Sequence, residues 1–310
     1  MEIIFMGTPA FAVPSLEALA RSKHSLLAVV TAPDKPRGRG QKVLPSPIKK
    51  CALDLSLPVL QPTTLKDPAF LDHLRTLAPD IFVVIAFRIL PPEVYTLPPL
   101  GAVNVHASLL PKYRGAAPIQ RAILHGETET GITTFQITGK VDTGKILIQK
   151  RISIDPEDTA GTLSERLEKV AAECLLETLE GLEDGTLTPL EQDNTLATPA
   201  PKIHPEETLL DFSQPGKEII NTIRAFSPQP GARFFLGGTL MKLLKAQFEP
   251  YPETIPGTIE KISKHAFAIH CKDGRILPEE IQPEGKRKMS VTDFMNGVDI
   301  TRYLSVDIHA

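Results

Sequence analysis

The N-terminal part of the chain alternates between short apolar runs and amphipathic stretches. The apolar runs predict β-strands, which lie at residues 2–7, 25–33, 57–62, 80–87 and 101–108. Stretches with apolar positions three and four residues apart predict helices, which lie at residues 14–22, 45–56, 67–79 and 117–126. Strands and helices that alternate in this way form an α/β fold, with an open parallel sheet covered by helices on both faces.

The last two predicted strands indicate where a ligand would bind. Residues 80–87 are apolar nearly throughout, which is typical of a central strand covered on both faces. Residues 101–108 instead carry Asn104 and His106, which point to the same side because alternate residues of a strand do so. Ligands of open parallel sheets bind beyond the carboxyl ends of the strands, where two donors could converge on one oxygen. So short a pattern also fits, and by itself favours, a polar pair satisfied within the sheet.

The pattern changes in the second half of the chain. Residues 129–138 and 144–154 predict antiparallel strands, and residues 162–185 predict a long helix that ends at Gly185. Residues 187–205 contain four prolines and many polar side chains, a composition typical of a linker. A helix within residues 211–228 then precedes short strands, which lie at residues 232–238, 240–248, 257–263, 266–274 and 275–285 and predict a small β-barrel. We therefore expect an N-terminal domain over 1–186, a linker over 187–205 and a C-terminal domain over 206–310.

Composition narrows the class of protein. The 310 residues include 42% hydrophobic side chains and carry a net charge of −3, so an anionic partner would have to meet a local basic patch. No apolar run is long enough to span a membrane, and the first residues do not have the pattern of a signal peptide. Cys51, Cys174 and Cys271 are odd in number and far apart, so they predict reduced thiols in a cytoplasmic protein.

A run of basic residues supplies one such patch. Residues 35–50 contain no acidic side chain and are rich in proline and glycine; the first basic residues among them are Lys35, Arg37, Arg39 and Lys42. A basic loop of this kind either binds nucleic-acid phosphates in a salt-dependent way or is merely solvated. A smaller cluster in the C-terminal domain consists of Lys286, Arg287 and Lys288.

Asp142 lies between the two predicted antiparallel strands. The segment 138–144 that contains it suits a tight hairpin turn, because Asp and Gly are common turn residues. Asp142 could instead fold back against His106, but their separation of 36 positions does not show this. The chain lacks the phosphate-loop, dinucleotide-binding, zinc-protease and serine-hydrolase motifs, which argues against those classes of enzyme.

Several stretches of the chain carry a resemblance to a known family. They are MGTPAFAVPSLEAL, TAPDKPRGRGQKVLPSPIK, NVHASLLPKYRGAAPIQRAI, VDTGKIL, EDTAGTLSERL and INTIRAFSPQPGA. With these residues the chain resembles the folate-dependent formyltransferases, and the basic loop and C-terminal domain narrow the resemblance to the methionyl-tRNA formyltransferase family. The resemblance implies a Rossmann-like formyltransferase domain with a mostly parallel sheet, followed by a small C-terminal barrel of the oligonucleotide-binding (OB) type.

The resemblance also implies an activity. The family transfers the formyl group of 10-formyltetrahydrofolate to the α-amino group of methionyl-initiator tRNA, giving N-formylmethionyl-tRNA for translation initiation. By motif, the catalytic residues would be Asn104, His106 and Asp142, and the folate-binding turn would be Ser108, Leu109, Leu110 and Pro111. The tRNA-binding loop would be residues 33–43, with Arg39 at the acceptor stem, and the C-terminal cluster of Lys286, Arg287 and Lys288 would also bind tRNA. The resemblance further implies a monomer that needs no metal.

The chain departs from the family pattern in places. The family's A-Y-G-x-I-L-P is replaced, in a segment that shapes the folate pocket, by Ala86-Phe87-Arg88-Ile89-Leu90-Pro91. The family's N-P-W-P is replaced by Ser227-Pro228-Gln229-Pro230. Lys145 stands where the family has an acidic or neutral residue after D-T-G. None of these changes removes a catalytic group that the resemblance implies.

Two other functions stay open at this point. One is a folate-dependent formyltransferase that acts on a nucleotide-sugar or purine-precursor amine; the basic loop and the C-terminal barrel argue against it. The other is a non-catalytic RNA-binding protein on a degenerate formyltransferase fold. The presence of Asn104, His106 and Asp142 argues against that second alternative.

Overall fold

The chain forms two compact units. The computed structural model describes residues 1–37, 42–252 and 255–307. The N-terminal unit comprises Met1–Pro118, Glu129–Ser153 and Ser164–Pro201, and the C-terminal unit comprises Ile119–Thr128, Ile154–Leu163 and Lys202–Ala310. Each unit has its own sheet, so the two are described separately.

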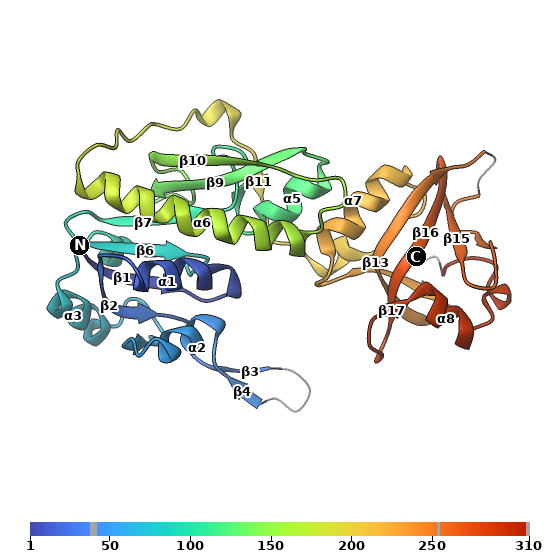
Figure 1. Cartoon of the computed structure of the whole chain (residues 1–310), viewed down its shortest axis with the longest axis horizontal. Coiled ribbons are helices and arrows are strands. Elements are labelled where there is room, and N and C mark those ends of the chain that lie inside the picture. The colour runs from blue at the N-terminus through green and yellow to red at the C-terminus, as the bar shows by residue number, and fades with distance from the viewer. Residues whose placement is uncertain (38–41, 253–254, 308–310) are drawn as a thin grey trace. The chain divides into compact units, whose positions relative to one another are not determined.

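The N-terminal unit is built on a seven-stranded sheet with the order β10-β9-β7-β6-β1-β2-β5 (Figure 1). The strands are β1 (Glu2–Gly7), β2 (Ser25–Val30), β5 (Val59–Leu60), β6 (Ile81–Ile85), β7 (Ala102–His106), β9 (Glu129–Gln136) and β10 (Ile146–Ser153). Strands β5, β2, β1, β6 and β7 are parallel, and β9 and β10 continue the sheet in antiparallel pairings. This confirms the predicted mostly parallel α/β sheet.

Helices cover both faces of this sheet. They are α1 (Val13–Ala20), α2 (Pro47–Asp54), α3 (Pro68–Leu77), α4 (Pro92–Tyr95) and α6 (Ala160–Glu183), with 3₁₀ turns at Ala10–Ala12 and Asn194–Leu196. Figure 1 shows α1 and α6 on the face of the sheet nearest the viewer. On one face of the sheet, Phe82 packs with Phe70 and Leu74 of α3. Strand β6 is buried along its whole length, as its continuous apolar run predicts.

The helices of this unit begin where the local sequence favours it. The Ser46 side chain caps α2 by accepting from the Lys49 amide, and the Asp67 side chain caps α3 by accepting from the Ala69 amide. Both helices also have proline in the first turn, where its missing N–H costs nothing. These caps fix the ends of helices that connect successive strands of the sheet.

The C-terminal unit contains an antiparallel sheet with the order β12-β13-β16-β15-β14, and β17 pairs with β16. Its strands are β12 (Ala232–Leu236), β13 (Thr239–Pro250), β14 (Ile259–Lys261), β15 (Phe267–Cys271), β16 (Gly274–Pro283) and β17 (Met289–Ser290). Its helices are α5 (Pro118–Leu124), nearly all of which belongs to this unit, α7 (Gly216–Phe226) and α8 (Val291–Gly297), with 3₁₀ turns at Pro205–Thr208 and Ile300–Arg302. The small C-terminal β-domain of short strands that the sequence predicts is confirmed, and its strands pair antiparallel.

Two segments differ from what the sequence suggests. The basic loop contains a short antiparallel hairpin, β3 (Lys35–Arg37) with β4 (Lys42–Leu44). The segment expected to be a linker, 187–205, belongs to the N-terminal unit as far as Pro201. It is held there by a Leu190–Ile146 backbone pair and by the parallel pairing of β11 (Pro199–Ala200) with β8 (Arg114–Gly115).

Two further observations concern the cysteines and the helices that could span a membrane. Cys51, Cys174 and Cys271 are buried and unpaired, and burial raises the pKa of the Cys174 thiol to about 11. Over the described ranges, no helix combines the length and apolar character that crossing a membrane requires.

An ion-pair cluster at the end of α6 gives a prediction about pH. Glu183 lies 2.7 Å from the Lys23 ammonium and 3.2 Å from the Met1 amino group. Hydrogen bonds to Lys23 first, and then to the amino terminus, lower the pKa of Glu183 to about 2 from an ordinary 4.5. A carboxyl whose pKa is lower in the folded chain stabilises the fold above its unfolded pKa and loses that contribution as pH falls through the folded pKa.

We therefore expect Glu183→Gln to lower the thermal midpoint at pH 7, and the difference from wild type to shrink as pH falls from about 4.5 toward about 2. Differential scanning calorimetry of both proteins across this range measures the effect. Glu180→Gln, on the same helix, is a matched control. A difference that is the same at every pH would contradict the assignment.

Candidate active site

Strand β7 brings Asn104 and His106 to the carboxyl edge of the parallel strands. As alternate residues of β7 they share one face, and β7 runs parallel to β6 with Asn104 opposite Val84. Asn104 is half-buried, and within the part of the chain that the structure describes its amide group forms no side-chain hydrogen bond. That amide is therefore available to a ligand.

The ring of His106 is buried and held in one orientation. Its Nε2 lies 2.8 Å from the Tyr113 carbonyl oxygen, which can only accept a hydrogen bond, so Nε2 is the protonated nitrogen. The ring also meets Phe135 edge-on, with the ring centroids 6.5 Å apart. The other nitrogen, Nδ1, lies 3.8 Å from Oδ2 of Asp142. Because Nε2 already holds one proton, Nδ1 can donate only when the imidazole is doubly protonated and positively charged.

Asp142 reaches His106 from the turn between β9 and β10. Its backbone is left-handed, with φ 53°, a conformation that aspartate adopts more readily than most residues. Its Oδ2 accepts a hydrogen bond of 2.8 Å from the Gly115 amide. Gly144 follows where a Cβ would lie 1.6 Å from the Gln136 carbonyl oxygen, so this turn requires glycine there. The fold thus brings together the His106 and Asp142 side chains, whose proximity the spacing alone could not show.

Two residues that border this region, Gln192 and Thr198, could not be predicted from the sequence. The Gln192 side chain donates to the backbone carbonyls of Asp142 and Gly144, at 3.0 and 2.7 Å. The Thr198 hydroxyl accepts from the Tyr113 amide at 2.9 Å. Both lie in the proline-rich segment that reads as a linker, and such a segment has no periodicity that would mark a packed residue.

The predicted folate-binding turn, residues 108–111, follows β7 directly and is tied to the sheet. The Ser108 carbonyl accepts from the Thr133 hydroxyl at 2.6 Å, and the Leu110 amide donates to the same hydroxyl oxygen at 3.1 Å. Ser108 and Leu110 are buried, whereas Leu109 is half-buried. Since these backbone groups already have partners in the protein, the turn offers a ligand chiefly apolar side-chain surface.

The segment that departs from the family pattern lies beyond the end of β6. Arg88 donates to the backbone carbonyls of Pro62 and Thr63 at 2.9 and 3.0 Å, and its guanidinium lies 5.1 Å from the centre of the Phe87 ring. Burial lowers the pKa of Arg88. Ile89, next in the chain, is 79% exposed. The segment therefore exposes an apolar side chain, whereas the Arg88 guanidinium is hydrogen-bonded to backbone carbonyls.

Three of the predicted tRNA-binding residues of the N-terminal unit, Lys35, Arg37 and Lys42, lie on the β3–β4 hairpin. Lys35 is exposed, and Arg37 is opposite Lys42 in the ladder. Arg39 lies outside the described residues. At the base of the hairpin, Asp34 accepts from Lys49 at 2.5 Å and from Gln61 at 2.9 Å, and these hydrogen bonds lower the pKa of Asp34.

The second predicted basic cluster belongs to the C-terminal unit. Lys286, Arg287 and Lys288 are exposed in the turn between β16 and β17. Lys288 lies 3.3 Å from Glu280, so part of this charge is compensated locally.

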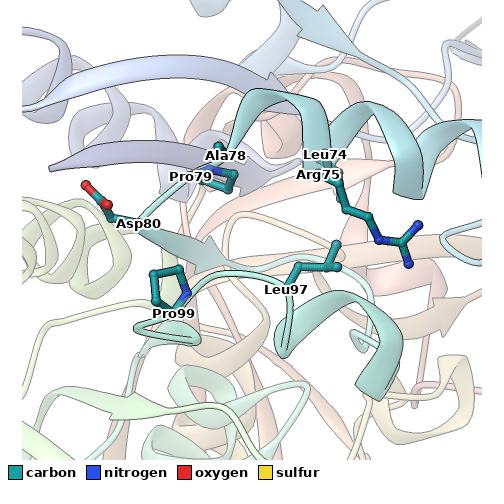
Figure 2. Close-up of a pocket in the computed structure, with 7 residues that line it drawn as sticks. All are labelled: Leu74, Arg75, Ala78, Pro79, Asp80, Leu97 and Pro99. Atoms are coloured by element: carbon teal, nitrogen blue, oxygen red, sulfur yellow. The ribbon is translucent and has the colours of Figure 1, made fainter.

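A pocket in the N-terminal unit lies away from the predicted catalytic residues (Figure 2). Its lining residues Ala78, Pro79 and Asp80 precede β6, and Leu97 and Pro99 precede β7. The pocket is therefore at the amino ends of these strands, whereas Asn104 and His106 are at the carboxyl end. Among the described residues, no group of three or more His, Cys, Asp or Glu side chains is arranged to hold a metal ion.

Comparison with known proteins gives the family. Sequence models described as "Formyl transferase" and "Formyl transferase, C-terminal domain" match residues 1–179 and 202–299. The chain is 44% identical over 299 residues to a protein of Moorella thermoacetica named methionyl-tRNA formyltransferase, with 96% of each chain covered. A protein of the same name from Caldanaerobacter subterraneus is 46% identical over 303 residues, with 97% of this chain and 98% of the relative covered.

Solved structures support the fold. An N-formyltransferase from Helicobacter canadensis, in complex with folinic acid and dTDP-3-aminofucose, superposes with a TM-score of 0.67 at 23% identity, covering 89% of this chain and 98% of that chain. Methionyl-tRNA formyltransferase from Clostridium thermocellum superposes with a TM-score of 0.56 at 19% identity, covering 80% and 94%. With both domains matched and relatives similar over nearly their whole length, the chain belongs to the methionyl-tRNA formyltransferase family.

Proposed function

We propose that this protein transfers the formyl group of 10-formyltetrahydrofolate to the α-amino group of methionyl-initiator tRNA. The observation that carries the proposal is the meeting of His106, at the end of β7, with Asp142, whose Oδ2 is 3.8 Å from His106 Nδ1. Two relatives that match over nearly the full length bear the name methionyl-tRNA formyltransferase. The proposed place of action is the cytoplasm, because the product is used in translation initiation.

The reaction begins with a neutral amine. An α-amino group has a pKa of about 7.7–8.0 in model compounds, so a fraction is unprotonated at neutral pH. The amine nitrogen attacks the formyl carbon, a C–N bond forms, and the carbonyl π electrons move to oxygen. The new negative charge needs hydrogen-bond donors that are already in place. Two groups fit this requirement: the Asn104 amide, which has no side-chain hydrogen bond to any residue that the structure describes, and His106 Nδ1 when the ring is charged.

The attacking amine must also lose a proton. Asp142 suits this role because one carboxylate oxygen is held by the Gly115 amide, while no side-chain hydrogen bond within the described ranges reaches Oδ1. Oδ1 can accept the proton as the amine attacks, and the proton then goes to N10 of the folate when the C–N10 bond breaks. The products are the formylated amine and tetrahydrofolate, so atoms and charge balance.

The formyl donor, 10-formyltetrahydrofolate, and the tRNA would bind different parts of the chain. The apolar surface of Leu109, at the turn after β7, suits a flat pterin ring. The basic hairpin suits the phosphates of an acceptor stem, with salt-dependent affinity. RNA is read mostly at unpaired ends and loops, which favours a projecting hairpin as the probe.

The acceptor is tested by comparing rates of formyl transfer from 10-formyltetrahydrofolate to three amines. We expect methionyl-initiator tRNA to react and methionyl-elongator tRNA and an amino-sugar nucleotide to react far more slowly. Rising salt is expected to increase KM for the tRNA and leave KM for the folate nearly unchanged. Preferential formylation of the sugar nucleotide would instead favour the alternative, a formyltransferase that acts on a small amine.

A further inference from the structure

The segment 190–200 forms a strap along the region that carries Asp142. We use "strap" for these residues. The amide and carbonyl of Leu190 pair with those of Ile146 at 2.8 Å, and Ala200 at the other end pairs with Gly115 in the β11–β8 ladder. The approach is close, because a Cβ on Gly115 would lie 2.5 Å from the Ala200 carbonyl oxygen. The strap thus contacts both backbone segments that surround the predicted catalytic carboxylate.

Gln192, in the middle of the strap, uses both ends of its amide group. Its Nε2 donates to the carbonyls of Asp142 and Gly144, at 3.0 and 2.7 Å. Its Oε1 accepts from Nη2 and Nε of Arg114, at 2.6 and 3.1 Å. Gln192 is 8% exposed, so these four bonds are formed with little competition from water.

These bonds link the Asp142 carboxylate to the Gly115 amide that donates to it, and the two must keep a fixed relative position. Arg114 precedes Gly115, whose amide donates to Asp142 Oδ2, and Gln192 holds the Asp142 backbone itself. One side chain therefore fixes the carboxylate and its amide donor relative to each other. Thr198 extends this support, because it binds the Tyr113 amide and the Tyr113 carbonyl accepts from His106 Nε2.

We propose that Gln192 is a positioning residue for formyl transfer, acting through the carbonyls of Asp142 and Gly144. This inference rests on the proposed function, in which Asp142 accepts the proton of the amine. Proton transfer demands correct heavy-atom geometry, and displacement of a group by about 1 Å can cost about a hundredfold in rate. Gln192 is buried and both ends of its amide are already bonded within the protein, so its loss should affect kcat and leave KM nearly unchanged.

The test compares two replacements of similar shape. Gln192→Met removes the donors and the acceptor, whereas Gln192→Glu keeps an acceptor for Arg114 and removes the donors. We expect kcat to fall by about tenfold to a hundredfold in both variants, with KM for tRNA and folate within about twofold of wild type. Glu191→Gln is the matched control, because Glu191 is in the same strap but is exposed and pairs only with Lys145 among the described residues.

A second readout does not depend on activity. Hydrogen exchange of the peptide that contains residues 139–146 is expected to become faster in both Gln192 variants and to stay unchanged in the control. Wild-type protein that forms no formylated product would overturn the proposed function, and the exchange experiment would still report whether Gln192 holds the turn.

Three outcomes would overturn the positioning role. If Gln192→Glu kept the wild-type kcat, the donors of Gln192 would not matter for catalysis and its only role would be to accept from Arg114. A rise in KM equal to the fall in kcat would indicate general disruption of the site. Unchanged exchange at residues 139–146 would show that the turn is held without Gln192. If Gln192→Met fails to fold, Gln192→Glu decides the same question.

Discussion

Replacement of Asp142 by asparagine is expected to lower kcat for formyl transfer by about 10²–10⁴-fold, with KM for both substrates nearly unchanged. An amide has almost the same shape as the carboxylate and can still accept from the Gly115 amide through its oxygen. It cannot accept the proton of the attacking amine, and it provides no negative charge opposite His106 Nδ1. Steady-state kinetics with methionyl-initiator tRNA measures both parameters.

The matched control for this variant is Asp184→Asn, an aspartate beyond the end of α6 and outside the proposed site. It should retain wild-type kcat. If Asp142→Asn kept more than about a tenth of the wild-type kcat, Asp142 would not be the proton acceptor.

Replacement of Asn104 by alanine is expected to lower kcat by about 10²–10³-fold, the loss observed when one oxyanion donor is removed from an enzyme. The Asn104 amide forms no side-chain hydrogen bond in the described part of the chain, so its loss leaves no orphaned protein group. The thermal midpoint should therefore change little. Loss of activity at unchanged stability, measured by single-turnover kinetics and calorimetry, would separate a catalytic role from a structural one.

Asn104→Asp provides the complementary test. It retains the shape of the side chain but replaces the N–H donors with a negative charge, which repels an oxyanion. We expect it to be at least as slow as Asn104→Ala. A variant with aspartate at this position that retained wild-type kcat would show that no anion forms beside residue 104.

The regular parts of the fold could be predicted because their sequence signals are local. Strand β6 is apolar over Ile81–Ile85 because both its faces are buried, and its neighbour β1 shows the same signal over Ile3–Met6. The turn between β9 and β10 was also evident from Asp142 and Gly144. Periodicity and turn chemistry depend on a few adjacent residues, so one sequence is enough to reveal them.

The assembly of the site could not be derived in the same way. The approach of Asp142 to His106 depends on β9 pairing antiparallel with β7, a long-range contact that no local pattern encodes. The resemblance to the family implies that the two residues act together, and the structure places His106 Nδ1 3.8 Å from Asp142 Oδ2. The role of Gln192 could not be predicted because its Nε2 donates to backbone carbonyls, which every residue carries and which therefore give no sequence signal.

The strap and the basic hairpin are two further segments whose order could not be predicted from local sequence. Proline and polar residues over 187–205 indicate irregular backbone, but they do not distinguish a free linker from a segment fastened by Leu190, Gln192 and Ala200. The basic loop likewise contains a hairpin whose base is fixed by Asp34, Lys49 and Gln61. In both segments the order comes from contacts with distant residues rather than from local propensity.

The most direct test is the transfer of a labelled formyl group from 10-formyltetrahydrofolate to methionyl-initiator tRNA by the wild-type protein and by Asp142→Asn, each in excess over the tRNA. We expect the wild type to form formylmethionyl-tRNA rapidly and the variant to form it about 10²-fold more slowly or worse, with equal binding of the tRNA. If both proteins transferred the label to tRNA at the same rate, the proposed role of Asp142 would be wrong. Absence of labelled tRNA with the wild type would contradict the proposed reaction itself.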